Sequence, residues 1–338
     1  LGDVYKRQPL RRRARINQLR LRGAAQNERP ASYPSPLCIS MAWEGFFMFA
    51  AFRVKRWMAA AAAALALGCG IGALARAALA ARPASAVPEN AVALPAVMYH
   101  GLLRDPSLQG TYVIDPALLE SDLVYLRENG YTPVHIADLL AWVDGRTELP
   151  EKPILLTFDD GAYNNYVYAY PLAQKYGMKM IFAPIGTWAD VYSESGEENA
   201  AYSTLTWERM REMQDSGLIE LQNHTYNLHA SENGRLGSGR KKGESEEAYA
   251  AVLSADLVKM QERMTAELGA PASCFVYPFG AIGEGEEAIV KNLGFRCTLT
   301  CDSRISYITR DPESLFGIGR RLRPPDCSSE EFFSFLRQ

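Results

Sequence analysis

The chain has few histidines, four among 338 residues, and none of its six cysteines lies in a Cys-x-x-Cys pair. This scarcity argues against a zinc ribbon and against a dithiol redox motif. Free buried thiols are the expected state of the cysteines, although a disulfide between Cys297 and Cys301 is an alternative. A formal net charge of −3 gives no electrostatic reason to expect a nucleic-acid partner. The 48% hydrophobic content supplies enough apolar material for a sizeable core.

The first 93 residues differ in composition from the rest. Residues 1–40 are rich in arginine and lack hydrophobic periodicity, and we interpret them as a non-native or disordered leader. Residues 41–76 combine a basic flank with an apolar run long enough to cross a bilayer, which predicts a signal peptide or, as we favour, an uncleaved signal-anchor helix. The positive flank predicts export of the body, with residues 77–93 as a linker.

Two adjacent aspartates follow the hydrophobic segment 153–157, which has the composition of a buried strand. Asp159 and Asp160 would therefore lie at the carboxyl end of that strand, where α/β folds place their chemistry. Side chains of neighbouring strand residues point in opposite directions, so the two carboxylates need not do the same job. The alternative is an ordinary turn, because Asp-Asp-Gly is also good turn chemistry.

Two of the four histidines, His224 and His229, follow a second short apolar segment at 217–222. Two histidines and an aspartate make a ligand set typical of catalytic zinc, which leaves coordination positions open for water and substrate. A lone histidine would more often be a surface or core residue. The pairing of these histidines with a carboxylate pair favours a metal site.

These motifs resemble those of the polysaccharide deacetylases of carbohydrate esterase family 4, which contain the NodB-homology domain. The first family motif, Thr-Phe-Asp-Asp-Gly, is present in full at 157–161, and His224-Thr225 with His229 resembles the second. The five-residue spacing of the histidines is similar to that of the branch with biofilm poly-N-acetylglucosamine deacetylases. The resemblance covers about residues 94–325. The fourth motif's Asp-Trp is not found.

The resemblance implies a divalent metal, most simply Zn²⁺ with Co²⁺ or Ni²⁺ as alternatives, bound by three residues: Asp160, His224 and His229. It implies that Asp159 is the catalytic base. It also implies that a backbone N–H of the third motif, at Phe279, holds the oxyanion. That motif ends in three residues that the chain retains: Pro278, Phe279 and Gly280.

The chain departs from the family at two functional positions. No histidine follows His229, so the fifth motif's general acid is missing. We expect His100, at the end of an apolar segment, to supply the acid; the alternative is a histidine that only caps the strand or orients a loop. For His135 we favour a structural role.

The arginine that begins the family's third motif is replaced by Val276. In the family this arginine orients the catalytic aspartate. Three arginines after a predicted strand at 315–319 are candidates to replace it: Arg320, Arg321 and Arg323. The alternative for any one of them is a solvated basic turn.

Strand and helix signals alternate from residue 94 to 338, which predicts an α/β fold, a single distorted (β/α) barrel behind the N-terminal membrane-anchor helix. Residues 230–245 are rich in Gly, Ser, Lys and Arg and are predicted to form an exposed insertion. Among the aromatic residues near the motifs we expect one or two to contact sugar: Tyr163, Tyr166, Trp188, Tyr226 and Tyr277.

Together these patterns predict an extracytoplasmic, metal-dependent N-deacetylase that acts on an N-acetylglucosamine-containing polysaccharide of the cell envelope or matrix. The alternatives are an O-acetyl esterase on the same site, which the missing acid mildly favours, and a catalytically weak sugar-binding module. Retention of both aspartates and both histidines argues against the module. The sequence identifies neither the polymer and its linkage nor the native metal.

Overall fold

The computed structural model describes residues 87–337. The predicted leader, the signal-anchor helix and most of the linker therefore lie outside the described residues. Within residues 87–337, no helix combines the length and the hydropathy needed to span a bilayer.

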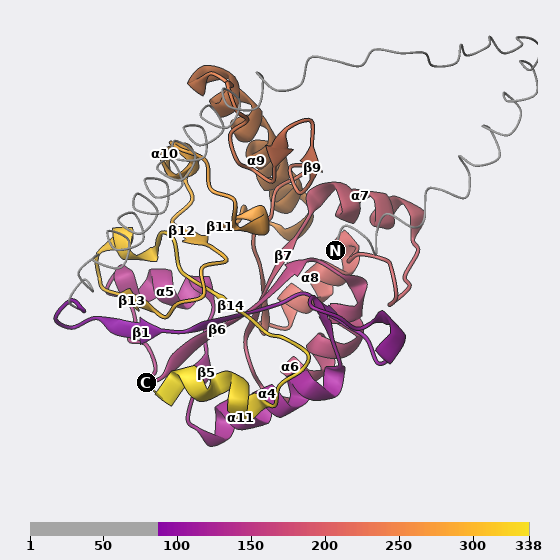
Figure 1. The fold of residues 1–338 in the computed structure, drawn as a ribbon, viewed down its shortest axis with the longest axis vertical. Helices are drawn as coiled ribbons and strands as arrows, with labels where there is room; N and C mark the ends of the chain where they lie inside the picture. The colour runs from indigo at the N-terminus through magenta and orange to yellow at the C-terminus, as the bar shows by residue number, and fades with distance from the viewer. Residues whose placement is uncertain (1–86, 338) are drawn as a thin grey trace, which may run out of the picture. The chain divides into compact units, whose positions relative to one another are not determined.

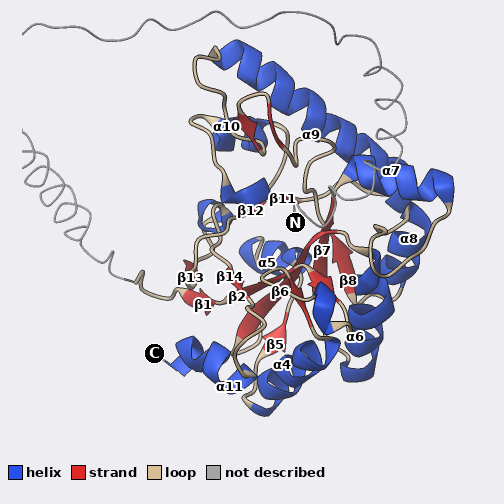
Figure 2. Ribbon diagram, turned by 45° about the vertical axis from the view of Figure 1, so that its right-hand side comes forward, coloured by secondary structure: helices blue, strands red, loops and turns tan. Residues whose placement is uncertain are grey.

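A six-stranded sheet with parallel pairings forms the centre of the fold (Figures 1 and 2). Its strands run in the order β14 (Arg321–Leu322), β2 (Ala96–Tyr99), β6 (Pro153–Asp160), β7 (Met180–Pro184) and β8 (Ile219–Leu221), and β5 (Thr132–Pro133) also pairs with β6. The α/β class with a parallel sheet is thus confirmed.

The other described strands form pairs. These are β1 (Val92–Leu94) with β13 (Ser306–Ile308), β3 (Gly101–Leu102) with β4 (Val113–Ile114), β9 (Ser231–Glu232) with β10 (Arg235–Leu236), and β11 (Cys274–Val276) with β12 (Cys297–Leu299). Two isolated parallel bridges extend these pairings. The bridge between Asn223 and Phe275 connects the end of β8 to β11, and the bridge between Leu299 and Ile318 connects β12 to the segment before β14.

All eight residues of β6 are buried, as expected of a strand that is covered on both faces. Because side chains alternate along a strand, Ile154, Leu156 and Phe158 pack in one apolar cluster, while Leu155 packs in a second cluster. This burial fixes the register of β6, and with it the position of the two aspartates at its carboxyl end.

Helices surround the sheet (Figure 2). Their bounds are α4 (Pro116–Glu128), α5 (Ile136–Val143), α6 (Tyr170–Tyr176), α7 (Gly186–Ser195), α8 (Trp207–Asp215), α9 (Glu246–Leu268), α10 (Glu286–Asn292) and α11 (Ser329–Phe332). Short 3₁₀ turns span Pro106–Leu108, Pro278–Gly280, Pro312–Leu315 and Phe333–Arg337, and a π-helical turn, Asn165–Ala169, precedes α6. Side chains cap the starts of α4, α8 and α11: those of Asp115, Thr206 and Ser328 each accept a hydrogen bond from a backbone N–H of the following first turn.

Two local predictions are wrong. In the segment 315–319, where a strand was expected, Leu315 ends a 3₁₀ turn that Asp311 caps and Pro312 begins, and only Ile318 forms a bridge, with Leu299. The strand follows as β14. The insertion at 230–245 is not simply an exposed loop. It contains the β9–β10 hairpin, and Arg235 and Ser238 in it are buried.

The expectation of free thiols is confirmed for the cysteines within the described range, which form no disulfide. Cys274 and Cys297 are partners in the register of β11 and β12, and both are fully buried.

Candidate metal centre and adjoining cavity

Asp159 and Asp160 end β6, and both line one cavity of about 310 Å³ together with His100. Consecutive strand residues would point to opposite faces, but Asp160 has a φ of +68°, which turns the chain and brings the second carboxylate to the same side. Gly161 continues the turn at φ +71°, and a Cβ there would lie 2.8 Å from the Cβ of Pro184. The glycine of the first motif is therefore required by both conformation and space.

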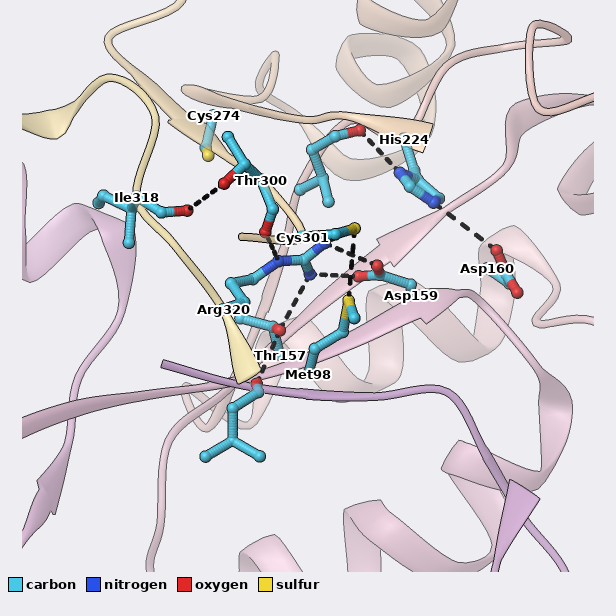
Figure 3. Close-up of polar contacts among 12 residues, drawn as sticks. Met98, Thr157, Asp159, Asp160, His224, Cys274, Thr300, Cys301, Ile318 and Arg320 are labelled. Carbon is cyan, nitrogen blue, oxygen red and sulfur yellow. Dashed lines mark hydrogen bonds and ion pairs between the residues drawn. The ribbon is translucent and has the colours of Figure 1, made fainter. Parts of the chain in front are cut away.

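Asp160 lies next to both histidines of the second motif. Its Oδ1 atom is 3.6 Å from Nε2 of His224 and 3.2 Å from Nε2 of His229. His224 comes three residues after β8, and its Nδ1 atom is 2.7 Å from the carbonyl oxygen of Val276, which fixes the ring and leaves Nε2 toward Asp160 (Figure 3).

The residues present fit a divalent cation. One ligand atom from each of Asp160, His224 and His229 lies within 4.8 Å of the others. Both carboxylate oxygens of Asp160 are buried and lack a hydrogen-bond partner among the described residues. A buried carboxylate without such partners is costly unless a cation compensates it. The donor set of two imidazoles and one carboxylate suits zinc, cobalt or nickel alike.

The local charges act strongly on these groups. Burial lowers the pKa of His229 to about 4. Burial alone would also lower the pKa of His224, but the Asp160 and Asp159 carboxylates raise it above its usual value. Burial would raise the pKa of Asp160, yet the neighbouring histidines hold it well below its usual value, so this side chain is a carboxylate.

Arg320 binds the other carboxylate, that of Asp159. Its Nη1 and Nη2 atoms donate to Oδ1 and Oδ2 of Asp159 at 2.7 and 2.8 Å, and Nη1 also donates to Oγ1 of Thr157 at 3.0 Å (Figure 3). The carbonyl oxygen of Thr300 accepts from Nε at 3.0 Å. Burial opposes ionisation of Asp159, but the Arg320 guanidinium outweighs it and lowers the pKa of that carboxyl.

The structure thus identifies the basic group that replaces the arginine missing at Val276. The solvated-turn alternative is wrong for Arg320 and also for Arg323, because both side chains are buried. Arg321 is partly buried and its guanidinium lies over the ring of Phe335.

His100 lies at the end of β2 and lines the cavity with the two aspartates. Its Nδ1 atom is buried and has no hydrogen-bond partner in residues 87–337. Burial lowers the pKa of His100, and the two carboxylates oppose that effect. His135, by contrast, caps α5, and its Nε2 atom is 3.0 Å from the carbonyl oxygen of Leu218, which agrees with a structural role.

The third motif lies beside the metal ligands. Pro278, Phe279 and Gly280 form a 3₁₀ turn in which Phe279 has a φ of +58°, and the Phe279 ring centroid is 4.3 Å from that of His229. The motif is therefore adjacent to the Asp160–His224–His229 set.

The five aromatic residues proposed from the sequence to contact sugar do not line the cavity. Tyr277 is buried, and the hydroxyls of Tyr163 and Tyr166 donate to Glu198 and Glu212. The aromatic residue that does line the cavity is Tyr112, which the sequence reasoning missed. Its place shortly after the segment that ends in His100 was the available signal.

Comparison with known proteins gives a consistent result. Residues 146–298 match the family described as polysaccharide deacetylase. A poly-β-1,6-N-acetyl-D-glucosamine N-deacetylase of Escherichia coli K12 is 29% identical over 255 residues, which cover 70% of this chain and 37% of the relative. The chain thus spans little more than a third of the length of that relative.

Two solved structures share the fold. IcaB from Ammonifex degensii superposes with a TM-score of 0.57 at 26% identity, over 69% of this chain and 93% of that chain. A de-N-acetylase from Aggregatibacter actinomycetemcomitans superposes with a TM-score of 0.60 at 24% identity, over 73% of this chain and 99% of that chain.

Proposed function

We propose that this chain, whose residues 146–298 match the polysaccharide deacetylase family, is a metal-dependent hydrolase that removes N-acetyl groups from a poly-β-1,6-N-acetylglucosamine-type polysaccharide. The observation that carries this proposal is the juxtaposition of the Asp160–His224–His229 set with an arginine-held Asp159, the two aspartates lining one cavity. The E. coli relative's name supports the choice of polymer.

Asp160, His224 and His229 would hold the divalent ion, Zn²⁺ being the simplest choice. When bound, such an ion supplies Lewis acidity that lowers the pKa of water and polarises a carbonyl group. The chain's contribution is a preformed ligand set, because the Val276 carbonyl oxygen fixes His224 and the left-handed turn fixes Asp160.

Asp159 would act as the general base that takes a proton from the attacking water. Arg320 occupies only one acceptor position on each carboxylate oxygen, and each oxygen has a second one. The guanidinium thus holds the carboxylate in place and keeps it ionised, while leaving it able to accept a proton.

His100 would donate the proton that the departing amine needs when the acetamide C–N bond breaks. It lines the same cavity, and its Nδ1 atom is not committed to another group of the described chain. The backbone N–H of Phe279 would stabilise the oxyanion on the acetyl carbon. The products are acetate and a free amine on the sugar.

We extend the proposal to the finer architecture and location. The bridges from β8 to β11 and from β12 to the segment before β14 support a distorted barrel. A polysaccharide substrate and the apolar segment within residues 41–76 support an extracytoplasmic enzyme, anchored in the membrane or secreted, in which residues 94–338 form the catalytic domain.

The test is acetate release by the purified protein, reconstituted with Zn²⁺, Co²⁺ or Ni²⁺, from N-acetylglucosamine oligomers with β-1,6 or β-1,4 linkages. Release that prefers the β-1,6 linkage, and that stops with chelator and in Asp159→Asn, supports the proposal. Oligomer binding without any release would indicate a sugar-binding module, and release only from O-acetylated sugars would indicate an esterase. Under this proposal His100, which lines the cavity, supplies the acid whose absence from the fifth motif favoured the esterase.

A further inference from the structure

The cavity has a second wall that the proposed chemistry does not use. Asp159, Asp160 and His100 line the cavity, and most of the remaining lining comes from the segment 103–113. The cavity's volume of about 310 Å³ is at the small end of the ~300–1,000 Å³ usual for small-molecule sites. It therefore suits one sugar unit rather than several.

Tyr112 is the aromatic residue of this wall. Its ring packs edge-on against the His100 imidazole, with 4.8 Å between the ring centroids. Its carbonyl oxygen also accepts a hydrogen bond from the N–H of Gly101 at 2.9 Å. Yet 40% of Tyr112 remains exposed, so much of the ring is open to a ligand.

The wall is held in place without any ligand. The backbones of Gly110 and Val113 exchange two hydrogen bonds, at 2.9 and 3.0 Å. Behind them, the Oδ1 atom of Asn164 accepts from the N–H of Leu102 at 2.8 Å, and its Nδ2 atom donates to the carbonyl oxygen of Ala200 at 3.0 Å. Tyr112 is thus preorganised, which lowers the entropy that binding would cost.

The chemistry of the wall suits a pyranose ring. An exposed aromatic face next to Leu108, which is also exposed, offers apolar surface for the C–H groups of a sugar. The polar groups that can bind the acetamido substituent, Asp159 and His100, line the same cavity. Sites of this kind combine an apolar lining with a few polar groups that fix orientation.

We propose that Tyr112 is a substrate-binding residue that packs against the sugar ring whose acetamido group enters between His100 and Asp159. This inference rests on the proposed deacetylase function and assigns the residue that selects a pyranose-borne acetyl group over an acetyl group without a sugar.

The experiment compares Tyr112→Ala and Tyr112→Phe with Tyr307→Ala, a matched control. Tyr307 is similarly exposed, at 46%, but lies on β13 and does not line the cavity. Two substrates are used: β-1,6-linked N-acetylglucosamine oligomers, and 4-methylumbelliferyl acetate, an acetyl ester without a sugar.

For the oligomer, Tyr112→Ala is expected to raise KM between about threefold and tenfold, the range that loss of one aromatic contact gives. KM for the ester should change less than KM for the oligomer, and Tyr112→Phe, which keeps the ring, should raise the oligomer KM less than Tyr112→Ala does. Tyr307→Ala should resemble the wild type on both substrates. An equal loss on oligomer and ester, or an unchanged KM for the oligomer, would overturn the inference.

A binding measurement separates this inference from the proposed function. Calorimetry of oligomer binding to the Asp159→Asn protein, with and without Tyr112→Ala, needs no turnover. If the wild type releases no acetate but Tyr112→Ala still weakens binding, the deacetylase proposal fails and the sugar contact stands. If oligomers do not bind, or bind equally well to both proteins, the sugar contact is wrong.

Discussion

Two buried arginine–aspartate pairs contain arginines that lie close together in the sequence, but the surroundings of the two pairs differ. Arg320 binds Asp159 at the end of β6, while Arg323 binds Asp122 on α4, with Nε and Nη2 at 2.8 and 3.1 Å from its oxygens. All four side chains are almost entirely buried. The interaction is thus the same in kind, and the consequences depend on the other neighbours of each aspartate.

Asp122 is completely enclosed. Besides Arg323, it accepts from the hydroxyl of Tyr99 at 2.9 Å and from that of Ser329 at 2.6 Å. These contacts join β2, α4 and α11, which lies beside α4 (Figure 1). Every acceptor is directed into the protein, so the pair can only hold elements together.

Asp159 has the same bidentate arginine but also lines a cavity. Neither of its oxygens accepts a hydroxyl in the way that Asp122 does; Thr157 binds the arginine instead. Asp122 thus accepts hydrogen bonds from three side chains, whereas Asp159 is held by Arg320 and still lines the cavity. Bidentate pairing with arginine is therefore common to both aspartates, and the cavity is what distinguishes Asp159 from Asp122.

The largest expected effect is that of Asp160→Asn, which removes the carboxylate that lies between the two histidines. We expect metal binding to be lost and acetate release to fall to the detection limit, because two neutral imidazoles and an amide form a poor site. Metal content by elemental analysis and acetate release measure the change. Asp122→Asn is the control, and equal metal loss in both variants would mean that the effect is on folding.

Asp159→Asn and Asp122→Asn compare the Arg320–Asp159 pair, whose aspartate lines the cavity, with the enclosed Arg323–Asp122 pair. We expect kcat to fall by about 10²–10⁴, the usual contribution of a general base, with the metal still bound. Asp122→Asn should lower stability by about 3–5 kcal/mol, because Arg323 would be left buried without its counter-charge, while kcat per folded molecule stays near the wild-type value. Urea unfolding and active-site-normalised kinetics measure both. A comparable fall of kcat in Asp122→Asn would break the distinction.

Arg320→Lys and Arg323→Lys test what bidentate geometry contributes in each pair. A lysine keeps the charge but cannot donate two parallel hydrogen bonds to one carboxylate. Arg320→Lys is expected to lower kcat about 10- to 100-fold with little change of KM, by analogy with other groups that orient active-site residues. Arg323→Lys should affect stability alone. If neither variant changes kcat, Arg320 does not position the base.

Local sequence predicted that two histidines and an aspartate come together, and the family resemblance selected Asp160 as that aspartate. Asp160 ends β6, which is apolar over most of its length, and His224 follows β8. Both strands are parallel to β7, which lies between them, so their carboxyl ends lie at the same edge of the sheet. The residues within each motif lie close together in the sequence, and the alternation of strand and helix signals predicted the α/β fold that places strand ends at one edge.

The residues that support the chemistry could not be predicted in this way. Arg320 is 161 residues from Asp159, and only the pairing of β14 with β2 and of β2 with β6 brings it close. Nothing in the local sequence separates Arg320 from Arg323, since both follow the same 3₁₀ turn. Tyr112 lies in a segment without a motif, and its role depends on the hydrogen bond between its backbone and Gly101.

Glu286 is a buried carboxylate that forms no ion pair with an arginine in residues 87–337, so it extends the comparison between Asp159 and Asp122. It is fully buried on α10, and one oxygen accepts from the N–H of Gly283. Burial raises the pKa of Glu286, whereas the arginine lowers that of Asp159. The folded state therefore binds the Glu286 proton more tightly than the unfolded state does, and this contribution to stability is lost as pH rises above about 4.3, the unfolded value.

Glu286→Gln should consequently gain stability relative to the wild type as pH rises from 4 to 8, because glutamine keeps an acceptor for Gly283 without a charge to bury. The free energy of unfolding, measured in urea across this range, gives the difference, which we expect to be smaller than the effects above. Glu287→Gln is the matched control, since Glu287 is half exposed and pairs with Lys291. Curves for Glu286→Gln and the wild type that stay parallel would show that burial without an arginine does not hold the proton on this carboxyl, and the contrast with Asp159 would then lie in the cavity alone.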